Sequence, residues 1–330
     1  MSATSSTNPK IVVAAEPRVI VVAGPTAAGK SALALAIAEE FGGVLINADS
    51  QQRFADLRIL TARPSAAEEA RVPHKLFGDL EAHESGSAAE WAAKAAAEIH
   101  AAAAANKLPI LVGGTGLYFR ALLEGLSDMP AVPAAVRAAA KALRDEIGPE
   151  AFHARLAARD PEIAARLAPG DTQRTLRAWE VVEATGTPLS VWQKSPGTPL
   201  LAARALRILM LPPRDDLYAA CDARFLAMLE AGALAEVQAM FSRGVDLSRG
   251  AGKALGVSDL AAVLSGDRAL REAVTLAQTA TRQYAKRQMT WFRNQFHAQL
   301  TVNEQFSERI LQGIFNKIDR FLLTGDPGGD

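Results

Sequence analysis

Predominantly apolar runs separated by polar loops predict a buried parallel sheet. The runs stand at residues 19–23, 43–48 and 107–112, and a fourth appears much later, at 205–211. Runs of this length without alternation are typical of strands covered on both faces. Helical spacing fills the intervals at residues 31–41 and 87–105. The β–loop–α order therefore predicts an open parallel sheet flanked by helices, with functional residues at the carboxyl ends of its strands.

The pattern changes after the third run. Residues 128–199 contain no convincing strand, and their helical spacing is interrupted by prolines and glycines, as at Gly148-Pro149 and Pro169-Gly170. We expect an all-helical insertion domain there, between two parts of one α/β core at 18–127 and 200–322. From residue 215 to about 321 the pattern predicts helix throughout. Residues 1–17 are expected to form a disordered tail, and 323–330 a frayed C-terminus.

Composition narrows the class of protein. Apolar residues make up 49% of the 330 residues, which is typical of a soluble globular protein. The single cysteine, Cys221, excludes an intrachain disulfide framework and suits the reducing cytoplasm. No stretch approaches the roughly 20 continuous apolar residues of a membrane span. Because 36 basic residues balance 36 acidic ones, any nucleic-acid binding must come from a local basic patch.

The first glycine-rich loop carries the clearest chemical signal. After the run at 19–23, the spacing Gly24-x-x-x-x-Gly29-Lys30-Ser31 matches the phosphate-binding P-loop, in the strand–loop–helix context that this motif requires. Glycines allow close backbone approach, and the helix N-terminus adds positive potential. Lys30 supplies a cation, and the Ser31 hydroxyl is placed to bind a divalent metal ion. A di- or triphosphate ligand is therefore expected, with ATP as the default.

Two further loops lie at strand ends. Asp49, after the second run, is placed for a general base or an indirect role in metal binding, although an N-cap or ordinary loop aspartate also fits this position. The third run ends in Gly113-Gly114-Thr115-Gly116 instead of the aspartate that ATP-hydrolysing enzymes commonly use for magnesium. This absence favours group transfer over energy coupling.

Arginines suggest an RNA partner. Arg174 and Arg177 lie three positions apart on one predicted helix, although a solvated surface pair fits this local pattern equally well. Residues 273–303 contain no acid, while Arg282, Lys286 and Arg293 fall on one helical stripe about 20 Å long. This stripe suits a phosphate backbone. The aromatic residues of the same segment are interpreted as core anchors.

The ordered set of motifs resembles the bacterial tRNA dimethylallyltransferases, the isopentenyl transferase family, over about residues 18 to 300. The matching runs are Gly24 to Ser31, Asp49-Ser50-Gln51-Gln52, Gly113 to Tyr118, Gln173 to Arg177, and Thr281 to Arg293.

The resemblance implies transfer of a dimethylallyl group from dimethylallyl diphosphate to the exocyclic amine of adenosine 37 of tRNA, in a monomeric cytoplasmic enzyme that uses Mg²⁺ and consumes no ATP. It implies a P-loop NTPase-like core. The tRNAs expected are those reading codons that begin with U. The diphosphate would be held by Gly24, Pro25, Thr26, Ala27, Ala28, Gly29, Lys30 and Ser31, with Ser31 on the metal.

The resemblance also implies roles for individual residues. Asp49 would be the base, and Thr26, Lys30 and Arg224 would stabilise the leaving diphosphate. The expected tRNA contacts are Asp49, Ser50, Gln51, Gln52, Thr115, Arg137, Gln173, Arg174, Thr175, Leu176, Arg177, Arg282 and Lys286. The sequence departs from the family pattern at Arg53, Phe54, Lys75, Ala220 and in the run Leu255 to Ser258.

Two other classes compete with this interpretation. A small-molecule kinase, such as a nucleoside or nucleotide kinase, would use the same P-loop for ATP, but the acid-free basic helix disfavours it. An RNA-binding protein with a vestigial loop is disfavoured by the intact Lys30-Ser31 pair and by Asp49.

Overall fold

The computed structural model describes residues 16–127, 129–195 and 197–324. It contains two compact units. Unit 1 comprises Met1–Leu122 with Leu201–Asp330, and unit 2 is Leu123–Leu200; the insertion was expected at 128–199. Most of the predicted tail, 1–17, and residues 325–330 lie outside the described part. Within the described part, the expected frayed end begins too early, because Leu323 and Thr324 belong to a helix.

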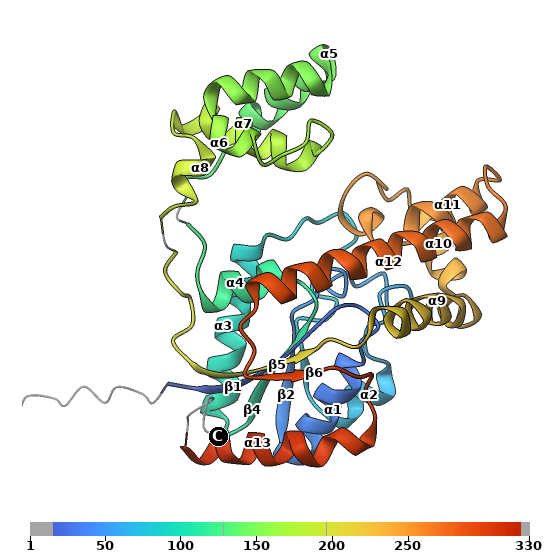
Figure 1. Cartoon of the computed structure of the whole chain (residues 1–330). Coiled ribbons are helices and arrows are strands. Elements are labelled where there is room, and N and C mark those ends of the chain that lie inside the picture. Colours follow the sequence, from blue (N-terminus) through green and yellow to red (C-terminus); the bar gives the residue numbers. More distant parts are fainter. Residues whose placement is uncertain (1–15, 128, 196, 325–330) are drawn as a thin grey trace, which may run out of the picture. The chain divides into compact units, whose positions relative to one another are not determined.

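Unit 1 is built on a six-stranded parallel sheet in the order β3-β2-β4-β1-β5-β6 (Figure 1). The strands are β1 (Arg18–Ala23), β2 (Gly43–Asn47), β3 (His74–Lys75), β4 (Leu108–Gly113), β5 (Arg204–Met210) and β6 (Leu300–Val302). The four long runs are strands, as predicted. The expectation of unbroken helix from 215 to 321 is wrong at β6, because three residues are too short to show a pattern of their own.

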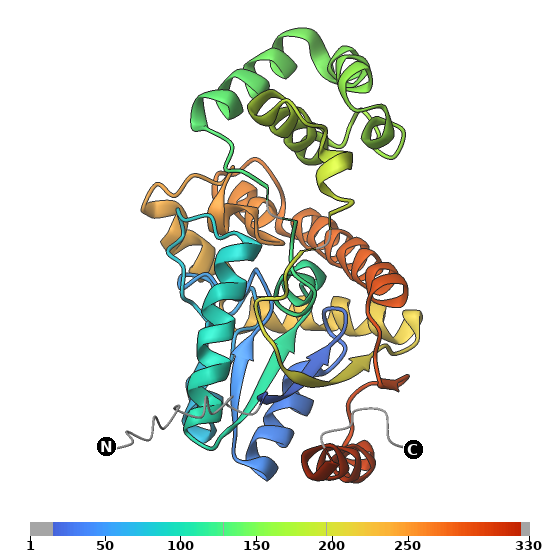
Figure 2. The ribbon, with the colours of Figure 1, turned by 90° about the vertical axis from the view of Figure 1, so that its left-hand side faces the viewer.

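Helices cover the sheet and extend beyond its carboxyl edge. They are α1 (Lys30–Phe41), α2 (Ala66–Arg71), α3 (Ala88–Ala104), α4 (Gly116–Leu123), α9 (Arg214–Glu230), α10 (Ala233–Ser242), α11 (Val257–Leu264), α12 (Leu270–Gln295) and α13 (Leu311–Thr324). Leu33 and Ile37 of α1 and Ile318 of α13 belong to the same apolar cluster as Ile20 and Ile208 of the sheet. The long α12 and its neighbour α9 are seen in both Figures 1 and 2.

A second apolar cluster lies among α9, α10 and α11 and includes Leu57 and Leu60 from the loop after β2. Glu236 of α10 fixes this loop, because its carboxylate accepts hydrogen bonds from the backbone N–H groups of Arg58, Ile59 and Leu60 at 2.6, 2.8 and 2.9 Å. The loop between β2 and β3 is therefore an anchored structure.

Unit 2 is helical, with no strand among its described residues. It contains α5 (Ala134–Arg159), α6 (Pro161–Ala164), α7 (Thr172–Thr185) and α8 (Leu189–Trp192). Helix α5 is broken where the sequence predicts a break, at Gly148 with φ 80°. The core includes Leu156, Val181 and Leu189. Buried Asp160 joins two helices, because its carboxylate accepts from the backbone N–H of Ile163 and of Ser190.

Among the described residues, no single helix is both long and apolar enough to span a membrane. Only α9 and α10 taken together, bent by 64° relative to each other, meet those two criteria.

Candidate active site

The loop after β1 leads directly into α1. Gly24 has φ 152°, and a Cβ there would lie 2.4 Å from the carbonyl oxygen of Met210 in β5, so only glycine fits. Gly29 has φ 89° and immediately precedes Lys30, the first residue of α1. The first N–H groups of a helix have no intrahelical partner and create positive potential. This backbone can therefore receive an anion.

Two cations flank the loop, buried Lys30 and half-buried Arg224. Lys30 is 9% exposed, and its Nζ donates to the carbonyl oxygen of Pro25 at 2.7 Å. Arg224 of α9 donates through Nη2 to Oγ1 of Thr26 at 2.5 Å. Burial lowers the pKa of Lys30 to about 8, an effect that nearby Asp49 opposes, and burial also lowers the pKa of Arg224. Among the described residues neither cation forms an ion pair, so an anionic ligand would offset the cost of removing both charges from water.

Asp49 is held by its neighbour Asn47. Asn47 is fully buried; its Oδ1 accepts from the Asp49 N–H at 2.8 Å, and its Nδ2 donates to the carbonyl oxygens of Asp49 and Leu76. The indole N–H of Trp91 in α3 donates to the Asn47 carbonyl oxygen at 2.8 Å. The Asp49 carboxylate in turn accepts from the Gln51 N–H. These hydrogen bonds therefore hold the backbone of Asp49 in a fixed position.

The second glycine-rich loop, after β4, is connected by hydrogen bonds to the P-loop and to the segment after β2. Thr115 Oγ1 accepts from the Ser50 N–H at 2.9 Å. Gln288 of α12 is 6% exposed and bridges the glycine-rich loops: its Oε1 accepts from the Thr26 N–H and its Nε2 donates to the Gly114 carbonyl oxygen, both at 2.8 Å. One buried glutamine thus fixes the spacing of two strand ends.

These loops enclose a cavity of about 540 Å³. It is lined by residues of the P-loop, the segment after β2, the end of β4, and α9; those with side-chain chemistry are Thr26, Lys30, Ser31, Asp49, Gln52, Thr61, Arg63, Glu68 and Arg224. A smaller cavity of about 30 Å³ is also lined by Thr26, Asp49 and Arg224. Its other walls are mixed: Leu60, Phe225, Met228 and Leu255 are apolar, and Gln51, Thr61, Thr281 and Tyr284 are polar. The predicted base, cations and metal-binding hydroxyl therefore share one space.

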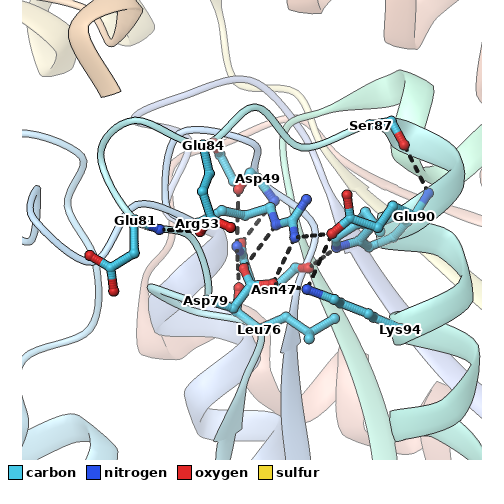
Figure 3. Close-up of polar contacts among 11 residues, drawn as sticks. Asn47, Asp49, Arg53, Leu76, Asp79, Glu81, Glu84, Ser87, Glu90 and Lys94 are labelled. Carbon is cyan, nitrogen blue, oxygen red and sulfur yellow. Dashed lines mark hydrogen bonds and ion pairs between the residues drawn. The ribbon is translucent and has the colours of Figure 1, made fainter. Parts of the chain in front are cut away.

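Arg53, one of the residues at which the sequence departs from the family pattern, pairs with Asp79 (Figure 3). The side chain is fully buried, and its Nε and Nη2 donate to the two carboxylate oxygens of Asp79 at 2.8 and 2.7 Å. Lys94 and Glu90 of α3 extend this network. Burial opposes the charge on Arg53, but the Asp79 hydrogen bonds outweigh it, so the pKa of Arg53 is raised. Arg53 thus ties the segment after Asp49 to α3.

Two glutamines expected on tRNA make contacts within the protein. The Gln51 Oε1 accepts from the Leu255 N–H at 3.0 Å. The Gln52 Nε2 donates to the carbonyl oxygens of Thr61 and Ala62 at 3.0 and 2.7 Å. Both side chains therefore shape the loops around the cavity.

Within unit 2, the arginine motif lies at the start of α7. Asp171 caps this helix by accepting from the Arg174 N–H, and Gln173 and Arg174 are exposed. Thr175 is buried, with its hydroxyl bonded to the Asp171 carbonyl oxygen, and Leu176 is half-buried. Arg177 contacts Glu180 at 3.9 Å; burial raises the pKa of Glu180, and Arg177 and Arg137 oppose this. Arg137 of α5 and Arg177 thus gather near one carboxylate.

The basic stripe of α12 is shorter than the sequence suggests. Arg282 is engaged by α9, since its Nη1 contacts both carboxylate oxygens of Asp222 at 2.6 and 2.7 Å. Lys286 and Arg293 are exposed. Tyr284, interpreted as a core anchor, instead lines the smaller cavity with Asp49, and burial raises its pKa above the ordinary range. The remaining exposed cations of the helix are still available to a polyanion.

Sequence reasoning missed Asn47, Arg63, Tyr284 and Gln288. Only Gln288 left a clear signal, because it interrupts the buried stripe of α12 formed by Thr281, Ala285, Met289 and Phe292. A polar residue at a core position of a helix indicates a buried hydrogen-bonding role.

Comparison with known proteins gives the family. The model of the IPP transferase family matches residues 52–295. The chain belongs to this family. It is 58% identical over 281 residues to a tRNA dimethylallyltransferase of Rhodospirillum centenum, covering 85% of this chain and 90% of the relative. A tRNA dimethylallyltransferase of Paramagnetospirillum magneticum is 50% identical over 305 residues, covering 92% and 97%.

Solved structures agree in fold. The tRNA isopentenylpyrophosphate transferase of Bacillus halodurans matches with a TM-score of 0.65 at 29% identity, covering 93% of this chain and 97% of that one. A eukaryotic dimethylallyltransferase acting on tRNA shares the fold with a TM-score of 0.77 at 24% identity, covering 94% and 81%. The expected family, P-loop-like α/β fold and enzyme class are confirmed: the chain is a prenyltransferase. The kinase and the vestigial-loop protein are set aside.

Proposed function

We propose that this chain transfers a dimethylallyl group from dimethylallyl diphosphate to the exocyclic amine of adenosine 37 of tRNA. The observation that carries the proposal is the shared cavity, in which Asp49 faces the same space as Lys30, Ser31 and Arg224. A carboxylate beside an anion-binding loop can accept a proton while the loop stabilises a departing diphosphate.

The reaction forms one bond and breaks another. The amine nitrogen attacks the allylic carbon as the carbon–oxygen bond to diphosphate breaks, and Asp49 takes the proton that the nitrogen loses. Negative charge grows on the leaving oxygen, where Lys30, Arg224 and the α1 N-terminus neutralise it. Thr26 holds the Arg224 guanidinium in place through their 2.5 Å hydrogen bond.

A magnesium ion fits this arrangement as a proposed cofactor. The Ser31 hydroxyl and the Asp49 carboxylate line the same cavity, and the described residues contain no cluster of three or more His, Cys, Asp and Glu side chains suited to a metal. Mg²⁺ commonly takes one or two protein ligands and completes its shell with substrate phosphate oxygens and water. The ion would supply additional positive charge to the diphosphate.

For tRNA, we propose contacts from both units. In unit 2 the tRNA would meet a surface that contains exposed Gln173 and Arg174 together with Arg177 and Arg137. In unit 1 it would meet Lys286, an exposed cation of α12. The target base must leave its stack to reach a carboxylate inside a cavity, as in other base-modifying enzymes. We expect the protein to act as a monomer in the cytoplasm.

The test is a labelling assay. The protein is incubated with Mg²⁺, labelled dimethylallyl diphosphate and unmodified tRNA whose anticodon reads codons beginning with U. Label entering adenosine 37 is expected, and tRNA with guanosine at position 37 is the matched negative control. ATP-dependent phosphorylation of a nucleoside, without prenyl transfer, would contradict the proposal.

A further inference from the structure

Arg63 is a cation of the cavity that the proposed mechanism does not use. It comes directly after Ala62 in the loop between β2 and β3 and lines the 540 Å³ cavity together with Lys30 and Ser31. It also lines an adjoining cavity of about 50 Å³ that Ser31 shares. That second space contains neither Asp49 nor Arg224. Arg63 therefore lies toward the Ser31 side of the site, away from the proposed base.

The guanidinium of Arg63 is incompletely satisfied by the protein. Its Nη1 donates to the carbonyl oxygens of Ala55 and Phe54 at 2.9 and 3.3 Å. Its Nε is buried and has no hydrogen-bond partner, and no ion pair involves Arg63 in the described part of the chain. Burial lowers the pKa of Arg63, and neighbouring Arg58 lowers it further. A half-buried cation with an unsatisfied buried donor is stabilised by a nearby anion.

The surrounding backbone holds the side chain in position. The Arg63 N–H donates to the Arg58 carbonyl oxygen at 2.9 Å, and Ala62 adopts a left-handed conformation with φ 54°. Gln52 bonds the carbonyls of Thr61 and Ala62 directly before it. A Cβ at Gly78 would lie 2.5 Å from the Arg63 guanidinium carbon, so the side chain packs on bare backbone there.

From this placement we propose that Arg63 binds the terminal phosphate group of the diphosphate substrate, the group farther from the reacting carbon. The inference rests on the proposed function, because that function puts the reacting carbon beside Asp49. Arg224 and Lys30 then serve the leaving oxygen, while Arg63 recognises the second phosphate and so distinguishes a diphosphate from a monophosphate. A guanidinium suits this task, because a charge-assisted hydrogen bond from it to a phosphate oxygen is stronger than a neutral one.

The experiment compares the full-length wild type with Arg63→Gln, Arg63→Lys and the charge-matched control Arg71→Gln. Arg71 pairs with Glu39 on the surface and does not line the cavity. Affinity is measured by calorimetry with Mg²⁺ for inorganic diphosphate, dimethylallyl diphosphate and dimethylallyl monophosphate. Arg63→Gln is expected to weaken binding of both diphosphates about tenfold or more and to leave the monophosphate unchanged. Arg63→Lys should lose less diphosphate affinity than Arg63→Gln, and Arg71→Gln should lose none.

Three results would overturn the role of Arg63: unchanged diphosphate affinity in Arg63→Gln, an equal loss for the monophosphate, or a lowered melting temperature as the only effect. Failure of the proposed function looks different. In that case the wild type would not label tRNA, whereas the dependence of inorganic diphosphate binding on Arg63 is measured without any prenyl transfer.

Discussion

Replacing Gln288 with methionine tests whether one side chain fixes the distance between the two glycine-rich loops. Methionine has a similar volume, so little cavity is created. It cannot replace either 2.8 Å hydrogen bond, and the substitution leaves the Thr26 N–H and the Gly114 carbonyl without their partner. Each unpaired buried group costs about 1–3 kcal/mol, so the free energy of unfolding should fall by about 2–6 kcal/mol. This is a large part of the roughly 5–15 kcal/mol typical of a folded domain.

Urea unfolding gives the stability, and hydrogen exchange gives the location of the effect. The urea midpoint of Gln288→Met should fall with an unchanged slope, and exchange of the Thr26 amide should accelerate. Gln283→Met, an exposed position of the same helix, should change stability by less than about 0.5 kcal/mol. A loss below about 1 kcal/mol in Gln288→Met, with protected exchange at Thr26, would refute the idea that this glutamine holds the two loops together.

Three further predictions concern the proposed reaction. Asp49→Ala should abolish labelling of tRNA while tRNA binding measured by filter retention persists; full activity would remove Asp49 as the base. The pKa of Lys30 is lowered to about 8, so the charge of its side chain is present below that pH and is lost above it. Diphosphate affinity should therefore fall more steeply between about pH 7.5 and 9 in the wild type than in Lys30→Arg, whose side chain stays charged. Parallel pH curves for the two proteins would contradict this. Arg174→Ala combined with Arg177→Ala should weaken tRNA binding and reduce its dependence on salt, and an unchanged salt slope would assign both arginines to an ordinary solvated surface.

Burial on both faces made the four long strands predictable. Such strands leave continuous apolar runs, and the P-loop spacing predicts the turn and the helix after the first of them. β3 and β6 have two and three residues, and at that length pairing with a neighbour decides the conformation more than the local sequence does. The helical character of unit 2 was also predictable, since its prolines and glycines fall at helix breaks and ends.

The site was predictable where it lies at strand ends and hidden where it depends on long-range pairing. Asp49 could be placed from its strand. The basic stripe could not be read correctly, because Asp222, which neutralises Arg282, lies 60 residues away on another helix. Asn47 shows the same limit: one polar residue at the end of an apolar run has many interpretations until Trp91 and Leu76 are seen around it.

The separation in sequence between the P-loop and its clamps has a consequence for synthesis on the ribosome. The phosphate motif is translated first, but Arg224 and Gln288, which hold Thr26, are 198 and 262 residues later. Unit 2, a compact unit of its own, is complete long before Gln288 emerges. A nascent chain therefore carries every glycine of the motif while its phosphate cradle is still open. Such distant contacts are slow to form, so the proposed cradle for a prenyl diphosphate is completed only near the end of translation.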